Sequence, residues 1–475
     1  MRIPRTSALI VAVALTGCAL NPPPARDEVA RQAMLNLTPP AQWTAGGTAG
    51  SVANDWLASF NDLWLNELVK EAIAYNADLR IAAARVDAAV AYLAAAKSPA
   101  WPQVNLVARG GGKMSGDSSG LSGVGLFATW ELDLWGRVRT EVRASEMQYE
   151  SAQLDAEYAR QSIAALVAKG WILAIEARLQ RTQAEASLKA AEELAALVQD
   201  RFRVGIGDEF ELSLAQANVE SFRDTVQNLE LAYANALRAL EALLGRYPAA
   251  AVAVAVALPP WPGEVPAGLP SELLERRPDV VAAERRVAAA FYRTEEAKAA
   301  RLPRITLVAN YTSISSELFV IKNRDNPLFS AGAGLIQPIF LGGLLQAQVD
   351  VRTAEQQAAI AEYGKIGQRA FGEVEGALSA GFTATQREEI LARAVRDNVR
   401  ALELANTRFR VGSIDLRGVQ QQQLSLYAAN VALLRMQAER LVQRVNLHLA
   451  LGGSFDPMPE AKTSDASGLL RQSER

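Results

Sequence analysis

Two long stretches of this 475-residue chain contain no proline, although the chain has twenty prolines in all. The stretches are residues 103–247 and 339–456, whereas seven prolines fall between residues 248 and 278. Proline inside a helix removes a hydrogen bond and clashes with the preceding turn, so only these two stretches can hold very long helices. A helix over residues 136–202 would be on the order of 100 Å long, which exceeds what an ordinary globular domain needs.

Apolar residues within these stretches recur at alternating spacings of three and four. The two runs are Ala184, Leu188, Ala191, Ala195, Val198 and Phe202, and Leu424, Tyr427, Val431, Leu434, Ala438, Leu441 and Val445. This spacing is typical of helices that pack side by side over many turns.

The chain also contains two copies of one unit. Residues 78–108 match residues 279–309 without a gap, and Arg-Phe-Arg-Val-Gly occurs at 201–205 and again at 408–412. Self-similarity of this kind indicates a repeated structural unit. The proline-dense stretch around residues 248–278 connects the two copies.

Each copy also contains segments in which apolar residues alternate with polar ones. Their apolar positions are Val104, Leu106 and Ala108; Leu126, Ala128, Trp130, Leu132 and Leu134; and Ile305, Leu307, Ala309 and Tyr311. A fourth segment, residues 329–340, is interrupted by Gln337 and Pro338, and Pro338 is expected to end it. Such alternation is typical of barrel strands with one face towards lipid and one towards a water-filled lumen, and soluble hairpin strands are the alternative.

Four membrane strands in one chain require a shared barrel. An open sheet edge in hydrocarbon leaves backbone groups unpaired at several kcal/mol each, and membrane barrels begin at about eight strands. At least two chains must therefore contribute to one closed ring. The Gly/Ser-rich residues 110–122 and residues 313–326 would form the outer loops.

The N-terminus has the pattern of an export signal. Arg2 and Arg5 precede a short apolar run that ends in Leu15-Thr16-Gly17-Cys18. The run is too short to span a bilayer, and it resembles the signal peptide and lipobox of bacterial lipoproteins. That resemblance implies that Cys18 becomes the acylated first residue of the mature chain, with an incidental cysteine as the alternative. In bacterial lipoproteins an aspartate directly after the cysteine commonly favours retention in the inner membrane. Here Ala19 follows Cys18, so the resemblance points to the outer membrane.

Charge and composition argue against nucleic-acid binding and catalysis. The chain has 49 Lys and Arg against 52 Asp and Glu, so the basic excess of a nucleic-acid-binding protein is missing. With one cysteine and one histidine, metal sites and catalytic triads have few ligands to use. His448 lies in an apolar helical run and is expected to be a packing or helix-surface residue. We expect no metal and no cofactor apart from the lipid on Cys18.

Together these features resemble the TolC-like outer-membrane factor family, and within it the lipidated NodT-type efflux lipoproteins. The resemblance covers about residues 57–453 and rests on the lipobox, on Trp-Glu-Leu-Asp-Leu-Trp-Gly-Arg at 130–137, on the paired Arg-Phe-Arg-Val-Gly segments and on Leu-Gly-Gly at 451–453. It implies a mainly α fold with membrane β: a long antiparallel α-helical barrel plus four strands per chain. In a homotrimer these strands would form one 12-stranded outer-membrane barrel.

The resemblance also implies partners and a function. The chain would be the gated, passive channel of a tripartite efflux or type I secretion-like system, embedded in the outer membrane and extending into the periplasm. Its partners would be a periplasmic adaptor (membrane fusion) protein and an inner-membrane transporter of the RND type, and it would carry out no chemistry. A periplasmic coiled-coil scaffold lipoprotein is the alternative. The sequence does not identify the substrate.

The two Arg-Phe-Arg-Val-Gly segments would form turns at the periplasmic tip and meet the adaptor. Gly205 and Gly412 suit a chain reversal with positive φ, and Asp208 and Asp415 are placed to cap the returning helices. Capping alone is the alternative role for this set. The predicted tip residues are Arg201, Val204, Gly205, Asp208, Arg408, Val411, Gly412 and Asp415.

The resemblance places the closing constriction of the channel at Arg417 and Gln421. Relatives commonly have an apolar residue and, four residues on, an aspartate, so this chain departs from the pattern. Three Arg417 side chains near a three-fold axis would repel one another unless paired with an acid such as Asp415, Asp208 or Glu209. We therefore expect an Arg–acid network at the gate, with a solvated Arg417 as the alternative.

These expectations divide the chain into six parts. They are a signal peptide (1–17), a lipidated extended segment (18–55), a first repeat (56–245), a Pro-rich connector and equatorial region (246–278), a second repeat (279–453) and a C-terminal tail (454–475). The first repeat would hold strands at about 101–113 and 122–134, a long helix at 137–202 and a helix at 209–245. The second would hold strands at about 303–315 and 329–340, a long helix at 343–408 and a helix at 415–452.

Overall fold

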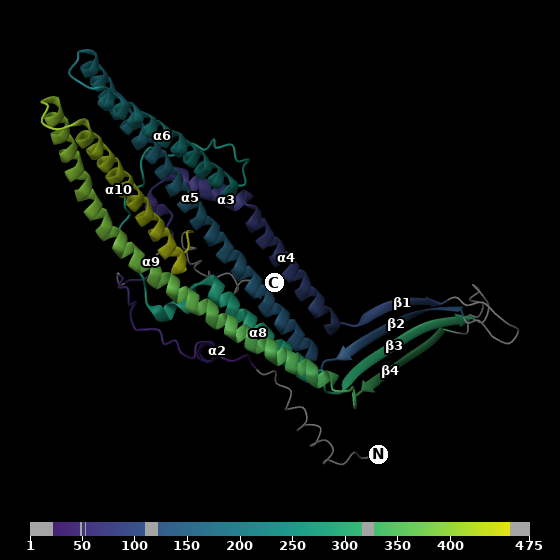
Figure 1. Cartoon of the computed structure of the whole chain (residues 1–475). Coiled ribbons are helices and arrows are strands. Elements are labelled where there is room, and N and C mark those ends of the chain that lie inside the picture. Colours follow the sequence, from purple (N-terminus) through teal and green to yellow (C-terminus); the bar gives the residue numbers. More distant parts are fainter. Residues whose placement is uncertain (1–21, 48–49, 53, 110–121, 316–326, 457–475) are drawn as a thin grey trace, which may run out of the picture. The chain divides into compact units, whose positions relative to one another are not determined.

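The computed structural model describes residues 22–47, 50–52, 54–109, 122–315 and 327–456 (Figure 1). Cys18, the predicted outer loops over 110–121 and 316–326, and most of the C-terminal tail lie outside the described residues. The elements in chain order are α2 (Arg26–Ala33), α3 (Leu63–Tyr75), α4 (Ala77–Lys97), β1 (Gln103–Arg109), β2 (Ser122–Leu132), α5 (Arg137–Arg203), α6 (Glu209–Leu243), α7 (Leu273–Arg276), α8 (Pro278–Ala299), β3 (Arg304–Ser315), β4 (Pro327–Ile336), α9 (Leu344–Arg410) and α10 (Leu416–Ala450). Three short 3₁₀ helices complete the set: Ala58–Phe60, Ser98–Ala100 and Pro270–Glu272.

The proline-free stretches hold the long helices. Helices α5 and α9 have 67 residues each, and α6 and α10 have 35 each. Their bounds lie within two residues of the ranges expected from the sequence. Among the described helices, none combines the length and the apolar character needed to cross a membrane.

Two segments differ from expectation. The strand expected over 329–340 is β4, which begins earlier, at Pro327, and ends earlier, at Ile336. Pro338 lacks the N–H that would continue the ladder, and the chain leaves the sheet just before it. The segment expected to be extended over 18–55 contains α2, in which Asp27 and Glu28 in the first turn suit the helix dipole and Val29 is buried.

The described chain divides into two compact units, and α5 and α9 run through both. The first unit takes in Ile81–Ala156 and Pro278–Gln368, with the described N-terminal residues up to Thr38. It contains one antiparallel sheet of order β1-β2-β3-β4, so β1 and β4 are its edges. Within this unit Arg26 of α2 pairs with Glu284 of α8 at 2.7 Å.

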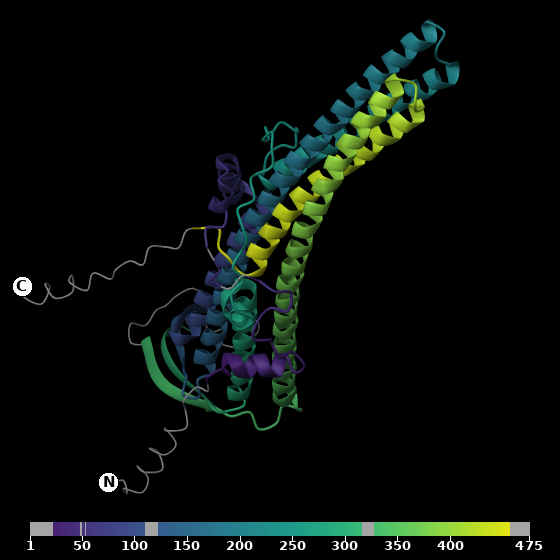
Figure 2. The same cartoon turned by 90° about the vertical axis from the view of Figure 1, so that its left-hand side faces the viewer.

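The second unit takes in Pro39–Arg80, Glu157–Arg277 and the described residues from Arg369 onward. Its α5–α6 and α9–α10 hairpins lie side by side (Figures 1 and 2). The largest core cluster surrounds Trp171, which is fully buried and donates from Nε1 to Asp62 at 2.8 Å. The same carboxylate caps α3, accepting from the backbone of Trp64 and Leu65.

In this unit the end of each hairpin is held by the side chain of a residue far away in the sequence. Asn76, before α4, donates from Nδ2 to the carbonyl of Leu243 at 2.9 Å. Arg277, before α8, donates from Nη1 to the carbonyl of Ala450 at 3.2 Å. Leu243 and Ala450, which carry these carbonyl groups, are the last residues of the 35-residue helices α6 and α10. A side chain thus fastens the same helix end in both copies.

A glycine allows the same close approach in each copy. Gly245 has φ +75°, and a Cβ there would lie 2.7 Å from the carbonyl oxygen of Tyr75. Gly452 has φ +70°, and a Cβ there would lie 3.2 Å from the backbone of Arg276. Both positions therefore require glycine for conformation, and Gly245 also requires it for space.

Candidate functional site

One face of the four-stranded sheet is apolar over most of its length. Successive strand residues point to opposite faces, so the register sorts side chains into two sets. Leu126 pairs with Leu106 on one side and with Tyr311 on the other, and Tyr311 pairs with Phe329. The apolar members of this set are Val104, Leu106 and Ala108; Val124, Leu126, Ala128, Trp130 and Leu132; Ile305, Leu307, Ala309 and Tyr311; and Phe329, Ala331, Ala333 and Leu335. Ser313, which pairs with Val124, is a polar member of the same set.

The apolar face is uncovered. Leu106, Leu335 and Phe329 expose 69%, 66% and 73% of their surface. The opposite face is mainly polar or glycine, for example Asn105, Thr306, Asn310 and Gly332, although Val107, Phe127, Val308 and Ile336 also lie on it. A continuous exposed apolar face of this size marks a surface that meets lipid or another protein.

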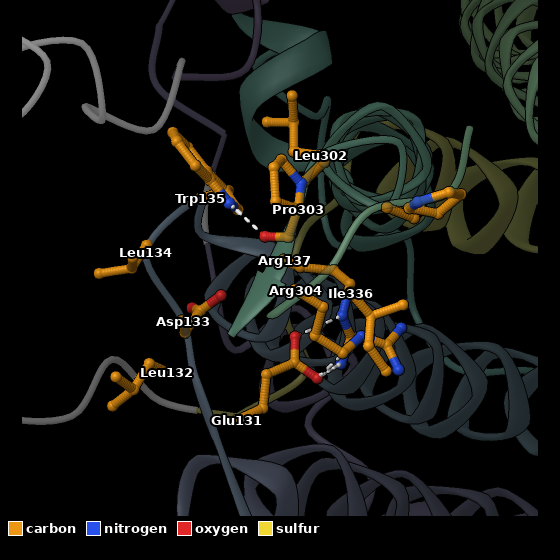
Figure 3. A pocket seen from close by; sticks show the side chains of 13 residues that line it. Glu131, Leu132, Asp133, Leu134, Trp135, Arg137, Leu302, Pro303, Arg304 and Ile336 are labelled. Carbon is orange, nitrogen blue, oxygen red and sulfur yellow. Dashed lines mark hydrogen bonds and ion pairs between the residues drawn. The ribbon is translucent and has the colours of Figure 1, made fainter. Parts of the chain in front are cut away.

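An ion-pair network surrounds Arg137 at the start of α5, just after the end of β2 (Figure 3). Arg137 binds Glu131 of β2 through two contacts, Nε to Oε1 at 3.0 Å and Nη2 to Oε2 at 3.1 Å. Its Nη1 also lies 3.5 Å from Glu296 of α8, and Arg304 of β3 lies 3.5 Å from Glu131. Hydrogen bonding to Glu131 raises the pKa of Arg137. The network joins two strands to two helices.

Two further residues, Asp133 and Trp135, fix the turn from β2 into α5 (Figure 3). Asp133 accepts from the backbone N–H of Val138 at 3.0 Å and of Arg139 at 2.9 Å, so it caps the first turn of the helix. Trp135 donates from Nε1 to the carbonyl of Pro303 at 2.6 Å. Asp133, Trp135 and Pro303 line a pocket of about 230 Å³ between the strand ends and the start of α5.

Sequence reasoning singled out residues 130–137 by resemblance but assigned no role to Glu131, Asp133 or Arg137. The signal was available for Asp133, because an acid just before a long helix is an N-cap pattern. Glu296 on α8, which pairs with Arg137, and Arg304 on β3, which pairs with Glu131, lie far away in the chain, so no local pattern indicates them.

Both predicted tip turns adopt the expected conformation. Gly205 has φ +79° and Gly412 has φ +73°. Asp208 accepts from Glu211 N–H at 2.7 Å, and Asp415 accepts from Gly418 N–H at 3.0 Å, so both aspartates cap the returning helices. The neighbouring Val204 and Val411 are exposed, at 67% and 75%. Contact with an adaptor stays a prediction.

The side chains of the two tip turns make different contacts within the chain. The guanidinium of Arg201 lies over the ring of Phe409 at 4.8 Å, and Phe409 is only 2% exposed. Phe409 belongs to a cluster with Leu194, Val198, Leu416 and Val419 that joins the hairpins. The corresponding residues of the other copy, Phe202 and Arg408, are exposed, and Arg408 has no side-chain partner within the described chain.

The proposed gate residues lie one turn apart on α10, and both are exposed. Within the described part of a single chain, Arg417 makes no ion pair; its guanidinium lies 4.9 Å from the ring of Phe210. The expected pairing with Asp208, Asp415 or Glu209 is therefore not formed within the chain. Both aspartates are already engaged by backbone N–H groups, and an aromatic face is the nearer partner for the cation.

His448 is a packing residue, as one reading of the sequence predicts, and the helix-surface alternative is wrong. It is 2% exposed, and its ring stacks on Trp56 at 5.7 Å. Burial, together with the nearby Arg444 cation, lowers the pKa of His448 to about 3. Over the described residues, no group of three or more His, Cys, Asp or Glu side chains could hold a metal ion.

Comparison with known proteins gives consistent matches over most of the chain. The family described as "Outer membrane efflux protein" matches residues 68–246 and 269–453. The pyoverdine export outer membrane protein OpmQ of Pseudomonas aeruginosa is 30% identical, over 92% of this chain and 94% of that protein. The cation efflux system protein CusC of Escherichia coli O6:H1 is 29% identical, over 94% of this chain and 97% of that protein.

Solved structures agree with these matches. The outer-membrane channel OprN superposes with a TM-score of 0.81 at 27% identity, covering 88% of this chain and 98% of that one. A crystal structure of CusC superposes with a TM-score of 0.78, also at 27% identity, covering 87% of this chain and 97% of that one.

Proposed function

Because this chain belongs to the outer membrane efflux protein family, we propose that it is the outer-membrane channel of a tripartite efflux system. In this role it is a passive, gated exit for substrates that an inner-membrane pump, of the RND type, delivers through a periplasmic adaptor. The observation that carries the proposal is the sheet with one exposed apolar face, whose strands lead into the 67-residue helices α5 and α9. The relatives are named for pyoverdine export and for cation efflux, so related channels serve substrates of different kinds.

The sheet edges support a closed ring of subunits, and we propose that the ring is a homotrimer. Strands β1 and β4 each have one unpaired side, and unpaired backbone groups in hydrocarbon are costly. Pairing β4 with β1 of the next subunit removes both edges at once. Three chains with four strands each would then close a barrel of about twelve strands, well above the minimum of about eight. Acylation of Cys18 would add a second attachment to the outer membrane.

The tip residues offer a matching contact between subunits. Within the chain, Arg201 of the first hairpin covers Phe409 of the second. Because both hairpins carry Arg-Phe-Arg-Val-Gly, the next contact around a closed ring would place Arg408 over the partner subunit's Phe202. This contact would cover the phenylalanine that a single chain leaves 42% exposed. It would hold the periplasmic end closed until the adaptor binds the exposed turns, while Arg417 and Gln421 line the constriction.

Single-channel recording in planar lipid bilayers tests the channel. The purified protein is expected to give discrete conductance steps, and a trimeric preparation that gives none contradicts the proposal. Arg417→Ala is expected to raise the conductance, because it removes the side chain nearest the constriction; unchanged conductance refutes the gate.

Arg408→Ala separates the subunit contact from general effects of charge. It is expected to increase open probability, whereas Arg410→Ala, an exposed arginine on the same turn, leaves it unchanged. Equal effects of both variants would refute the Arg408 contact. A tag inserted at Ser118 distinguishes the scaffold alternative, since only a membrane-spanning chain displays it on the cell surface.

A further inference from the structure

A cavity of about 450 Å³ in the second unit is lined by the connector after α6 and by α9 and α10. Its volume lies within the range of about 300–1,000 Å³ that is typical of small-molecule sites. The residues that give the cavity its character are Trp261, Leu378, Phe382, Arg440, Arg444 and Leu447. Two cations thus face an otherwise largely apolar wall.

Arg444 is buried, and it has no carboxylate partner among the residues that the structure describes. It is 7% exposed, and its Nη1 and Nη2 donate to the carbonyl of Gly263 at 2.6 Å and to Oγ of Ser59 at 3.1 Å. Two of its five N–H donors are thereby used, and its Nε has no acceptor in the described chain. Burial lowers the pKa of Arg444 to about 10. A buried cation that has only neutral partners is costly, and a bound anion would lower that cost.

Arg440 lies one turn earlier on α10 and shares an aromatic neighbour with Arg444. Its guanidinium is 3.8 Å from the ring centre of Trp261, and that of Arg444 is 5.7 Å from the same ring. Arg440 also pairs with Glu388 at 2.7 Å, so its charge is already partly compensated. Glu264, which also lines the cavity, already takes part in a polar interaction. Arg444 therefore carries the main attraction for an anion.

We propose that this cavity binds a small amphiphilic anion, with a carboxylate or phosphate against Arg444 and Arg440 and an apolar body against Trp261, Phe382 and Leu378. Arginine suits both oxyanions because its planar fork can bind two oxygens at once. The proposal goes beyond the exit-channel function, since a passive channel needs no bound ligand in its wall.

Calorimetric titration of the full-length protein in lipid nanodiscs tests the site, with empty nanodiscs as the blank. The probes are 2-naphthoate and 2-naphthyl phosphate, which separate the two oxyanions, and neutral naphthalene-2-carboxamide. One anion per chain is expected, with at least about tenfold weaker binding of the carboxamide, because a hydrogen bond to a charged partner contributes that much. Equal binding of all three probes, or binding of none, overturns the proposal.

Two variants place the binding in this cavity. Arg444→Gln is expected to weaken anion binding about tenfold or more, whereas Arg435→Gln, an exposed arginine on the same helix, leaves it unchanged. Should Arg444→Gln fail to fold, Phe382→Asp places a negative charge at an exposed position of the lining and is expected to weaken binding without disturbing the core. Anion binding that survives Phe382→Asp and a folded Arg444→Gln refutes the site. Single-channel conductance is expected to be unchanged in these variants. The binding measurement therefore tests the anion site, and the conductance measurement tests the channel function, independently of each other.

Discussion

His448 makes the stability of the second unit depend on pH in a way that one substitution can remove. The ring is 2% exposed, and neither of its nitrogens has a hydrogen-bond partner among the described residues. Its pKa falls to about 3 in the folded chain, compared with about 6.5 for an unperturbed histidine. The buried ring therefore stays neutral while an exposed one takes up a proton.

The direction of the effect follows from which state binds the proton. Between about pH 6.5 and pH 3 the unfolded chain is protonated at His448 and the folded chain is not, so stability falls as pH falls. The slope is about 1.4 kcal/mol per pH unit, or roughly 2–3 kcal/mol per chain between pH 6.5 and 4.5. Above pH 6.5 both states are neutral, and His448 adds no pH dependence.

Thermal unfolding of wild type and His448→Leu, followed by intrinsic fluorescence at pH 7.5, 6.5, 5.5 and 4.5, measures this contribution. Carboxylates titrate in both proteins, so the difference between their unfolding midpoints isolates the histidine. Relative to the variant, the wild type is expected to lose stability progressively below pH 6.5, with a constant difference above it. A difference that is flat from pH 7.5 to 4.5 would refute the reasoning.

Substitutions at three further positions test the contacts that hold helix ends in place. Urea unfolding midpoints measure their effect on stability. Asp133→Ala is expected to lower stability by about 1 kcal/mol through loss of the α5 cap, and Asp133→Asn to retain most of it. Gly245→Ala is expected to lower the free energy of unfolding by about 3 kcal/mol, because the new methyl group clashes with Tyr75 and the backbone has positive φ. Gly263→Ala, with φ +95° and open space, is expected to lower it by about 1 kcal/mol. Equal losses of stability in the two variants would contradict the role of the clash. Arg277→Met is expected to cost about 2–3 kcal/mol, and a neutral outcome would show that its buried hydrogen bonds are dispensable.

The long helices could be predicted because their signals are local and repeated. The absence of proline over 103–247 and 339–456 and the three-four spacing of apolar residues act at every turn. The tip turns are similarly local, since a glycine and an aspartate three residues apart determine both the reversal and the cap. The expected start of the fourth strand was two residues late and its expected end four residues late, because its alternation is weak and only Pro338 signals its end.

The arginines show where sequence reasoning stops. Arg417 was expected to meet an acid, but Phe210 lies beside it, and that choice depends on how two hairpins pack. In the sequence, Arg444 looks like an ordinary helix-surface cation and Arg277 like an ordinary cation of the Pro-rich connector. The carbonyls of Ala450 and Gly263, which accept from them, are 173 and 181 residues away along the chain. Burial of a charge is decided by tertiary contacts, which periodicity does not encode.

The open edges of the sheet have a genetic consequence. If three copies must join β4 to β1 in turn, one copy with a damaged edge leaves the ring open for all three. When damaged and intact chains are made in equal amounts and mix at random, only about one assembly in eight contains intact copies alone. An allele with a proline in β1 or β4 is then expected to be dominant over the wild type, whereas an allele that never folds is expected to be recessive.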